Sequence, residues 1–483
     1  MTSDNLKRHY GDESPITAFA TVPANSALTL IRCSGKGSIE LVSSVFSADL
    51  KKAEGNTIIH GWIFKKGNEA AEKIDEVLVS VFRAPKSYTG EDGADICCHG
   101  GSSAGIAVMD ILKSAGFCEA LPGEFTFRAF MNGKLDLTKS ESVMELVSAK
   151  TEAGRRHAIM RLSGSLQNEI NEIKNKLVQV LAGAEIYLDY SDDEVSADED
   201  EAAGKLPNKN MAQEALEHLK KLSASWQIER VYQEGITLVI AGRPNAGKSS
   251  LFNALLKEDR SIVTEIPGTT RDWIEAWVSI EGIPVRLIDT AGLRDCGDSV
   301  EKIGIERSRK ILEEAELVLY LLDGALEEMT SEDKLFIDKN INDKRYIFVW
   351  NKTDRCQSPP NNLQNIITND GENPERSLIC VSAKTGGGIT ELYSAVVSAV
   401  LRQTSLQADE TCAASVGTER QKNLVDAACR ALEEALTLTE REEPLDLIAP
   451  LLRDAVNLLG EITGEVSTAD ILEEMFMRFC VGK

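Results

Sequence analysis

The sequence has little of several features that would assign it to a special class of protein. Its 483 residues include 53 Lys and Arg against 77 Asp and Glu, so the net charge is −24. A protein that binds nucleic acid with its general surface is usually basic, and this excess of acid argues against such a surface. If RNA is bound, a small local patch or a basic partner must supply the phosphate contacts. The G-x-G-x-x-G fingerprint of dinucleotide-binding proteins is also missing.

Disulfide pairing, zinc binding and membrane insertion each lack their sequence pattern. The ten cysteines form no C-x-x-C pair, which indicates reduced thiols rather than a disulfide framework or a zinc site. No apolar run approaches the roughly 20 residues of a membrane span, and residues 1–15 lack the apolar core of a signal peptide. We therefore expect a soluble, cytoplasmic protein with no membrane partner, built from two to four domains.

The hydrophobic pattern changes twice along the chain. The first ~130 residues alternate strand-like and helix-like runs, and from about Leu135 a helical period takes over. The strand-like runs are Ile16–Val22, Leu28–Arg32, Val77–Phe82 and Asp95–Cys98, and the helix-like runs are Ser38–Val45 and Ser102–Lys113. Apolar residues then recur as the single face of one long helix at Ile159, Leu162, Leu166, Ile170, Ile173, Leu177, Leu181, Ala184 and Leu188. An acidic loop is predicted at Ser191–Glu201, followed by a helix leading to Tyr232.

A block of buried parallel strands interrupts the helical region. The predicted strands are Ile236–Ile240, Val285–Ile288, Leu317–Leu322, Tyr346–Trp350 and Leu378–Val381. Helical spacing returns after Arg420. The sequence thus predicts a multidomain chain: an α+β N-terminal domain (1–134), an all-α helical domain in two parts (135–230 and 402–483) and an inserted α/β, Ras-like P-loop domain (231–401).

The strongest chemical signal is the phosphate-binding loop G-x-x-x-x-G-K-S at Gly242–Ser249, between a strand and a helix. Its backbone amides and the helix start favour phosphate, Lys248 should reach the β- and γ-phosphates, and Ser249 should bind Mg²⁺. The residues expected to contact nucleotide here are Asn245, Ala246, Gly247, Lys248, Ser249 and Ser250.

Three further motifs follow later strands in the order that a guanine-nucleotide site requires. They are Asp289-Thr290-Ala291-Gly292, Asn351-Lys352-Thr353-Asp354 and Ser382-Ala383-Lys384. Asp289 can hold Mg²⁺ through water, and the Gly292 amide can contact the γ-phosphate. The Asp354 carboxylate can accept from the N1–H and the 2-amino group of guanine, a donor pair that adenine lacks. The motifs therefore predict a site for GTP rather than ATP.

The means of hydrolysis differs from that of Ras-like proteins. Leu293 stands where those proteins have a water-orienting Gln, and the chain shows no evident arginine finger. Thr270 is placed to close on Mg²⁺, the carbonyls before it are available, and Asn245 offers an amide oxygen. Such an oxygen cage suits K⁺, which would supply the missing positive charge. On these grounds alone, an Asn245 that only braces its own loop is an equal alternative.

Taken together, these motifs resemble those of the tRNA modification GTPases named MnmE or TrmE, within the TrmE-Era-EngA-like potassium-activated GTPases. The resemblance includes the Asn245 loop, the G-T-T-R-D of Gly268–Asp272 and the V-E-x-I-G-I-E-R of Val300–Arg307. It implies that Glu301 orients the attacking water and that two G domains meet in a homodimer. The resemblance implies that K⁺ is bound by Asn245, Thr264, Ile266 and Thr269. Thr264 and Thr269 are also expected to belong to the GTP site.

The ends of the chain resemble the same family. The motifs are Ile31–Gly35, Pro85–Asp92, His99–Gly101, Pro122–Asp136 and the terminal Phe479–Lys483. The resemblance implies binding of a 5-formyl- or 5,10-methylene-tetrahydrofolate by Arg32, Glu91, Lys134 and Lys483. Cys480 would be either a nucleophile towards uridine or an anchor for the tail. The family commonly has a glycine-rich loop where this chain has Pro23–Ala27, which lacks glycine's backbone freedom.

The implied activity is GTP hydrolysis coupled to tRNA modification. By this resemblance a flavin-dependent partner of the MnmG (GidA) family carries FAD and most of the tRNA contacts. The product would be a carboxymethylaminomethyl or aminomethyl group at C5 of the wobble uridine, U34. The alternative is a regulatory GTPase switch that acts on ribosome assembly or another partner without chemistry of its own.

Overall fold

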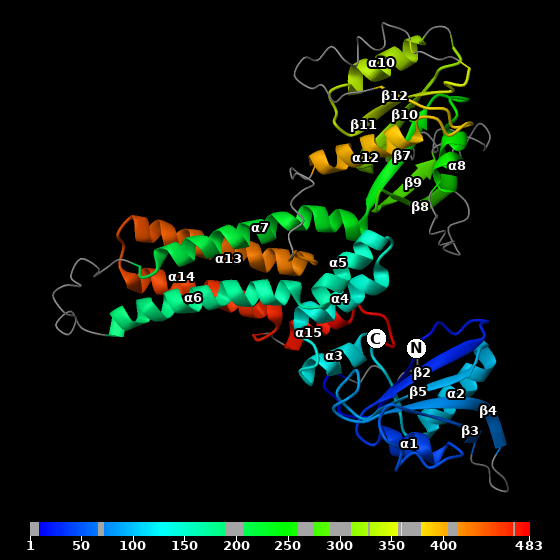
Figure 1. Ribbon diagram of the computed structural model, residues 1–483, viewed down its shortest axis with the longest axis vertical. Helices are drawn as coiled ribbons and strands as arrows, with labels where there is room; N and C mark the ends of the chain where they lie inside the picture. Colours follow the sequence, from blue (N-terminus) through cyan, green and yellow to red (C-terminus); the bar gives the residue numbers. More distant parts are fainter. Residues whose placement is uncertain are drawn as a thin grey trace. The chain divides into compact units, whose positions relative to one another are not determined.

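The computed structural model divides the chain into two compact units (Figure 1). It describes residues 9–65, 72–189, 206–258, 274–289, 311–326, 329–355, 359, 378–403, 414–466 and 469–483. The first unit comprises Met1–Met144, Gln167–Ala215 and Ala427–Lys483, and the second comprises Glu145–Leu166 and Leu216–Asp426. The predicted acidic loop, Ser191–Glu201, lies outside the described residues. Across the described ranges, no helix is long and apolar enough to cross a membrane.

A six-stranded mixed sheet with two helices forms the N-terminal part of the first unit. The strand order is β3-β4-β5-β2-β1-β6, antiparallel except for the β1–β6 pair. The elements are β1 (Ile16–Phe19), β2 (Leu28–Ser34), α1 (Ser38–Ser44), β3 (Thr57–Lys65), β4 (Glu72–Phe82), β5 (Gly93–His99), α2 (Ser102–Ala115) and β6 (Cys118–Glu119). The four predicted strands and two predicted helices are confirmed, whereas β3 and β6 were not predicted.

The two faces of this sheet differ in what covers them. The helices α1 and α2 bury one face, where Ile31, Val79 and Ile96 are fully covered (Figure 1). Cross-strand pairing places Leu28, Ile58 and Leu78 on the opposite face, in different rows and beside His99, Ser80 and His60 respectively. Their exposed fractions are 58%, 68% and 45%. They are separate exposed apolar residues on a face that also carries polar side chains.

Helices make up the remainder of the first unit. They are α3 (Glu124–Met131), α15 (Ala469–Phe476), α14 (Leu445–Thr463) and parts of α4 (Leu137–Ser148), α6 (Ser165–Asp189), α7 (Lys209–Glu234) and α13 (Glu419–Glu440). Their apolar faces are buried, as Ile170, Ala215, Leu432 and Leu459 show. The amphipathic period supplies this helical core, as expected.

The expectation of one long helix from Ile159 to Leu188 is wrong. The chain breaks between α5 (Glu152–Leu162) and α6, at Ser163 and Gly164. Gly164 has φ of +98°, a left-handed conformation that ends a helix. The apolar period continues across the break because both helices contribute to buried surfaces.

The second unit contains the inserted sheet. The order is β12-β11-β10-β7-β9-β8, parallel except for the β8–β9 pair. The elements are β7 (Ile236–Gly242), α8 (Lys248–Glu258), β8 (Ile274–Ile280), β9 (Ile283–Asp289), β10 (Leu317–Asp323), α10 (Ser331–Asn340), β11 (Tyr346–Asn351), β12 (Ile379–Cys380) and α12 (Ile389–Gln403). The five predicted parallel strands are confirmed. The carboxyl ends of β7, β9, β10, β11 and β12 meet at one edge, where ligands bind in such folds.

A buried arginine joins the places where the chain enters and leaves this insert. Arg161 of α5 is 1% exposed and donates to Glu145 (2.7 Å), Glu229 (2.8 Å) and the Ser415 hydroxyl (2.9 Å). Glu229 lies on α7 before β7, and Ser415 lies before α13. Burial alone would raise the pKa of Glu229, but the hydrogen bond from His157 and the charge of Arg161 lower it below its usual range. The cluster therefore stays charged and holds both chain crossings together.

We predict that Arg161→Met strongly destabilises the second unit. This substitution leaves two buried carboxylates without their cation. Such a loss typically lowers the free energy of unfolding by about 3–5 kcal/mol. Urea unfolding of the full chain should show a lower midpoint. Arg155→Met is the matched control on the same helix, because Arg155 forms only an exposed pair with Glu152. Equal midpoints for the two variants would contradict the prediction.

Candidate functional site

The phosphate loop follows the central strand β7 and is shaped by left-handed residues. Gly242, Asn245 and Gly247 have φ of +141°, +64° and +95°. A Cβ on Gly247 would lie 2.3 Å from the Asn351 amide nitrogen, so both its conformation and its close contact require glycine. Lys248 starts α8 and its ammonium donates to the carbonyls of Gly242 (3.1 Å) and Arg243 (2.9 Å). The loop thus carries a fixed cation beside a helix N-terminus, a natural phosphate site.

Two side chains at the end of β11 brace this loop. Asn351 donates to the Ala246 carbonyl (2.8 Å), and Lys352 donates to the Asn245 carbonyl (2.7 Å). Lys352 also contacts Asp323 at the end of β10 (2.6 Å). The strand register places Asp323 directly beside Asn351. Asn351 and Lys352 therefore hold this turn through its main-chain carbonyls. The Asn245 side chain is exposed, and its amide makes no hydrogen bond within the described part of the chain.

The groups expected to read guanine and hold magnesium also meet at this edge. Ser382 donates to Asp354 (2.8 Å), and this hydrogen bond lowers the pKa of the exposed Asp354 carboxyl. The Ala383 amide donates to Asn351 (3.2 Å). Ser249 donates to the buried Asp289 (2.8 Å), which brings together the hydroxyl and carboxylate oxygens that Mg²⁺ prefers. The Mg²⁺ ion therefore fits the residues present.

Several expected nucleotide and cation ligands cannot be placed. Thr264, Ile266, Thr269, Thr270, Thr290, Ala291, Gly292 and Glu301 lie outside the described residues. Ser250 and Lys384 are described, Ser250 in the first turn of α8 and Lys384 after Ala383. These assignments stay predictions.

A second group of predicted residues gathers around α3 in the first unit. Arg32 of β2 pairs with Asp95 at 3.1 Å. Its guanidinium carbon also lies 5.7 Å from the ring centre of Tyr88 and 5.9 Å from that of Phe125. Two aromatic faces and a carboxylate thus fix the orientation of this cation.

Glu91 belongs to the loop Pro85–Asp92, and Lys134 contacts the start of the same loop. Glu91 accepts from the Ser34 hydroxyl (2.8 Å) and from Arg128 (3.2 Å). The Lys134 ammonium donates to the Pro85 carbonyl (2.9 Å). Tyr88 shares a hydrogen bond with Thr126 of α3 (2.9 Å). The three candidate folate residues Arg32, Glu91 and Lys134 therefore converge on one loop and one helix.

The C-terminal tail packs within this same unit. The Cys480 carbonyl accepts from the Gly123 amide (3.2 Å), just before α3. Gly482 lies so close to Phe19 that an added Cβ would be 2.3 Å from the Phe19 carbonyl oxygen. The Cys480 side chain is exposed. The main chain of the tail is therefore anchored, while the Lys483 ammonium makes no ion pair with any described residue.

The glycine-free loop Pro23–Ala27 keeps ordinary backbone conformations, because none of its residues has a positive φ. Gly100, on the neighbouring segment, allows the two main chains to approach closely. An added Cβ on Gly100 would lie 1.8 Å from the Ser26 carbonyl oxygen. The loop therefore packs against the His99–Gly101 motif without glycines of its own.

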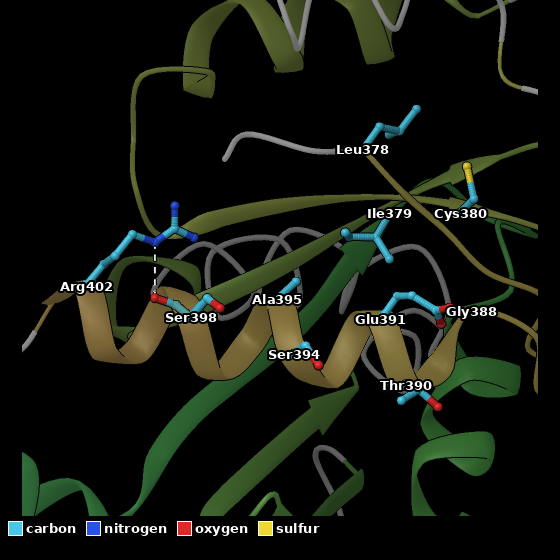
Figure 2. A pocket seen from close by; sticks show the side chains of 10 residues that line it. All are labelled: Leu378, Ile379, Cys380, Gly388, Thr390, Glu391, Ser394, Ala395, Ser398 and Arg402. Carbon is cyan, nitrogen blue, oxygen red and sulfur yellow. Dashed lines mark hydrogen bonds between the residues drawn. The ribbon is translucent and has the colours of Figure 1, made fainter. Parts of the chain in front are cut away.

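A pocket of about 850 Å³ lies beside β12 and α12 (Figure 2). Its polar lining includes Glu391, Ser394 and Ser398 on α12, and Arg402 donates to the Ser398 carbonyl (3.0 Å). None of the predicted nucleotide residues lines it. We therefore assign the nucleotide to the strand ends and not to this pocket.

Comparison with known proteins identifies the family. A model of the MnmE helical domain matches residues 137–480, and a model of the N-terminus of the GTP-binding protein TrmE matches residues 15–134. The tRNA modification GTPase MnmE of Treponema denticola is 42% identical over 480 residues, 98% of this chain and 99% of that protein. This chain belongs to the MnmE family of tRNA modification GTPases.

Further relatives match over nearly the whole length of this chain. The MnmE of Borreliella afzelii is 40% identical over 483 residues, 99% of this chain and all of that protein. That of Carboxydothermus hydrogenoformans is 38% identical over 475 residues, 98% of this chain and all of that protein. The resemblance inferred from the motifs is confirmed, and so is the assignment as a GTP hydrolase that uses Mg²⁺.

Sequence reasoning missed several residues that hold the site together. Asp323 was a detectable candidate, because it ends a buried parallel strand at the same edge as the other motifs. Arg128, Asp95 and Tyr88 lacked such a signal, because they contact predicted site residues that are distant in the sequence. Arg128 and Glu91 are 37 residues apart, and Asp95 and Arg32 are 63 residues apart. Only the fold brings these groups together.

We predict that Asp354→Asn exchanges base preference. An amide side chain loses one acceptor and gains a donor, so GTP affinity should fall by about a hundredfold. Affinity for xanthosine triphosphate, which has an oxygen at C2, should rise. Calorimetric titration measures both. In the control, Ser382→Ala, only one hydrogen bond to Asp354 is lost, and we expect less than a tenfold loss without a change of base. Unchanged GTP affinity in Asp354→Asn would show that Asp354 does not read guanine.

Proposed function

We propose that this chain couples GTP hydrolysis to the addition of a carboxymethylaminomethyl or aminomethyl group at C5 of U34 in certain tRNAs. The observation that carries this proposal is the convergence of Arg32, Glu91 and Lys134 on the α3 region that also anchors the Cys480 tail. A protein that acted only as a GTP switch would not need this second polar site. The relatives' name, tRNA modification GTPase, agrees with the proposal.

A reduced folate, 5-formyl- or 5,10-methylene-tetrahydrofolate, fits the chemistry of the second site. Arg32 and Lys134 provide cations for the carboxylates of the ligand, and Lys483 adds a third on the tail. Glu91 provides acceptors for ring N–H groups. The Tyr88 ring is 39% exposed and offers an aromatic surface beside them. When bound, the folate would supply a one-carbon unit, and the exposed Cys480 thiol lies on the tail as the candidate nucleophile.

A second subunit of the flavin-dependent MnmG (GidA) family would complete the reaction. This chain has no dinucleotide fingerprint and a net charge of −24. A partner that carries FAD and most of the tRNA phosphate contacts would supply both missing properties. A tRNA substrate, and cysteines that form no disulfide among the described residues, agree with a cytoplasmic protein.

Potassium would supply the positive charge that stabilises the transition state of GTP hydrolysis. The loop is braced through carbonyls, which leaves the Asn245 amide oxygen for a ligand. Thr264, Ile266 and Thr269 would complete the cage, Thr270 would join Ser249 on Mg²⁺, and Glu301 would orient water. A fixed monovalent cation at this position acts as an arginine finger would.

A homodimer would form through the open face of the N-terminal sheet. Leu28, Ile58 and Leu78 are exposed apolar residues on that face, which a second copy would cover. A symmetric dimer uses the same face of both subunits.

We expect GTP turnover to be at least about tenfold faster in K⁺ than in Na⁺ of equal ionic strength, because the cage selects by size. Asn245→Ala should abolish this difference while GTP still binds. Steady-state phosphate release measures the rates. Equal turnover in both salts would contradict the proposed K⁺ site and weaken the proposed role of Glu301.

Leu78→Glu should shift the protein from dimer to monomer, because a charge at this position would be buried in the interface without a partner. Sedimentation velocity measures the change. Leu447→Glu is the control, an exposed leucine (53%) on α14 that should leave the dimer intact. A dimer that survives Leu78→Glu would place the interface elsewhere.

Cells that lack this protein should lose the C5 modification of U34, as seen by mass spectrometry of tRNA nucleosides. The wild-type gene should restore it. Cys480→Ser distinguishes the two roles of the tail, since a nucleophilic thiol predicts no restoration and an anchoring role predicts full restoration. Normal modification in the deletion strain would leave the regulatory switch as the function.

A further inference from the structure

Arg128 is a buried cation in the first unit that the proposed activity does not use directly. Its side chain is 7% exposed. One terminal nitrogen, Nη2, donates to Glu124 (2.8 Å) and to the carbonyls of Asp12 (3.0 Å) and Ser14 (2.8 Å). The other, Nη1, faces both oxygens of Glu91, at 3.3 and 3.2 Å. One half of the guanidinium is therefore fixed by the scaffold, and the other half is directed at Glu91.

The chain makes room for this arginine. Gly35 has φ of +123°, and an added Cβ would lie 3.2 Å from Arg128 Nη1 and 2.8 Å from Pro15. Three segments therefore meet at one guanidinium: Gly35 leaves the space, Glu91 accepts, and α3 carries the arginine. The planar fork of arginine suits this task, since lysine offers no fixed pair of directions.

Glu91 is held firmly but is not enclosed. Its side chain is 24% exposed, whereas Glu124, the other carboxylate on Arg128, is 1% exposed. Ser34 donates to Glu91 Oε2 as well. Glu124 therefore balances the buried charge of Arg128, and Glu91 is the partner that still reaches solvent. A carboxylate has about four acceptor sites, so capacity remains on Glu91 for a ligand donor.

We propose that Arg128 is a positioning residue, which fixes the Glu91 carboxylate in the orientation that binds the N–H groups of the folate. This inference rests on the proposed folate site. Glu91 without Arg128 would sample other rotamers, and the affinity would then include the cost of ordering it. Arg128 acts only through Glu91 and touches no ligand atom.

A double-mutant cycle on the full chain tests the proposal, with 5-formyltetrahydrofolate as the probe in calorimetry. Arg128→Met and Glu91→Ala should each weaken binding at least about tenfold. The double variant should bind no more weakly than Glu91→Ala alone, because no side-chain acceptor remains for Arg128 to position. Losses that multiply in the double variant, or unchanged binding by Arg128→Met, would overturn the proposal.

Arg83→Met is the matched control for simple loosening. Arg83 pairs with Asp92, the neighbour of Glu91, and donates to three carbonyls, those of Leu50, Lys51 and Ala53. It therefore supports the same loop without touching Glu91. We expect binding within threefold of wild type. A loss equal to that of Arg128→Met would show that loop support alone explains the effect.

Hydrogen exchange separates failure of this inference from failure of the folate site. The Glu91 amide donates to the Thr89 hydroxyl (3.2 Å) and reports on the loop without ligand. Arg128→Met should speed its exchange in the wild-type background but not in the E91A background. If wild type binds no 5-formyltetrahydrofolate, the folate proposal fails, and this measurement still decides the coupling. Equal acceleration in both backgrounds overturns the positioning role.

Discussion

The nucleotide site depends on two hydrogen bonds that hold the phosphate loop by its main chain. Asn351 and Lys352 donate to the carbonyls of Ala246 and Asn245, and Gly247 allows the approach. These carbonyls would otherwise be unpaired in a tight, left-handed turn. The same two residues begin the motif that contains Asp354. The phosphate loop and the motif expected to read guanine are therefore joined by the same two residues, Asn351 and Lys352.

The insertion of this domain in a helical chain requires a second constraint. The chain enters the sheet through α7 and leaves it before α13, and Arg161 contacts both segments. Lys150 of the α4–α5 connection adds a contact with the Trp277 ring of β8, at 3.4 Å, and with the Glu234 carbonyl. Residues Glu145–Leu166 consequently pack with the insert as one compact unit. A buried charged cluster is a costly way to join segments, but it is highly directional.

In the first unit, the short helix α3 organises the second polar site. Phe125 lies beside Arg32, Thr126 contacts Tyr88, and Arg128 contacts Glu91. Gly123, just before α3, donates its amide N–H to the Cys480 carbonyl of the C-terminal tail. One signature segment therefore supports groups from β2, the Pro85–Asp92 loop and the chain terminus. The polar groups of this domain are thus gathered beside one short helix, apart from the buried core of the sheet.

The sequence by itself determined the order of elements, the parallel sheet and the nucleotide motifs, because strand periodicity and the phosphate loop are local patterns. Through resemblance to a family it also proposed a shared role for Arg32, Glu91 and Lys134, and that role stays a prediction. It could not determine the break at Gly164, the strand β3, or the partners of Arg128 and Arg161. Those depend on contacts between residues distant in the chain, such as Arg161 with Ser415. Spacing along a chain predicts a helix face or a strand end, but only the folded packing decides which buried charges meet.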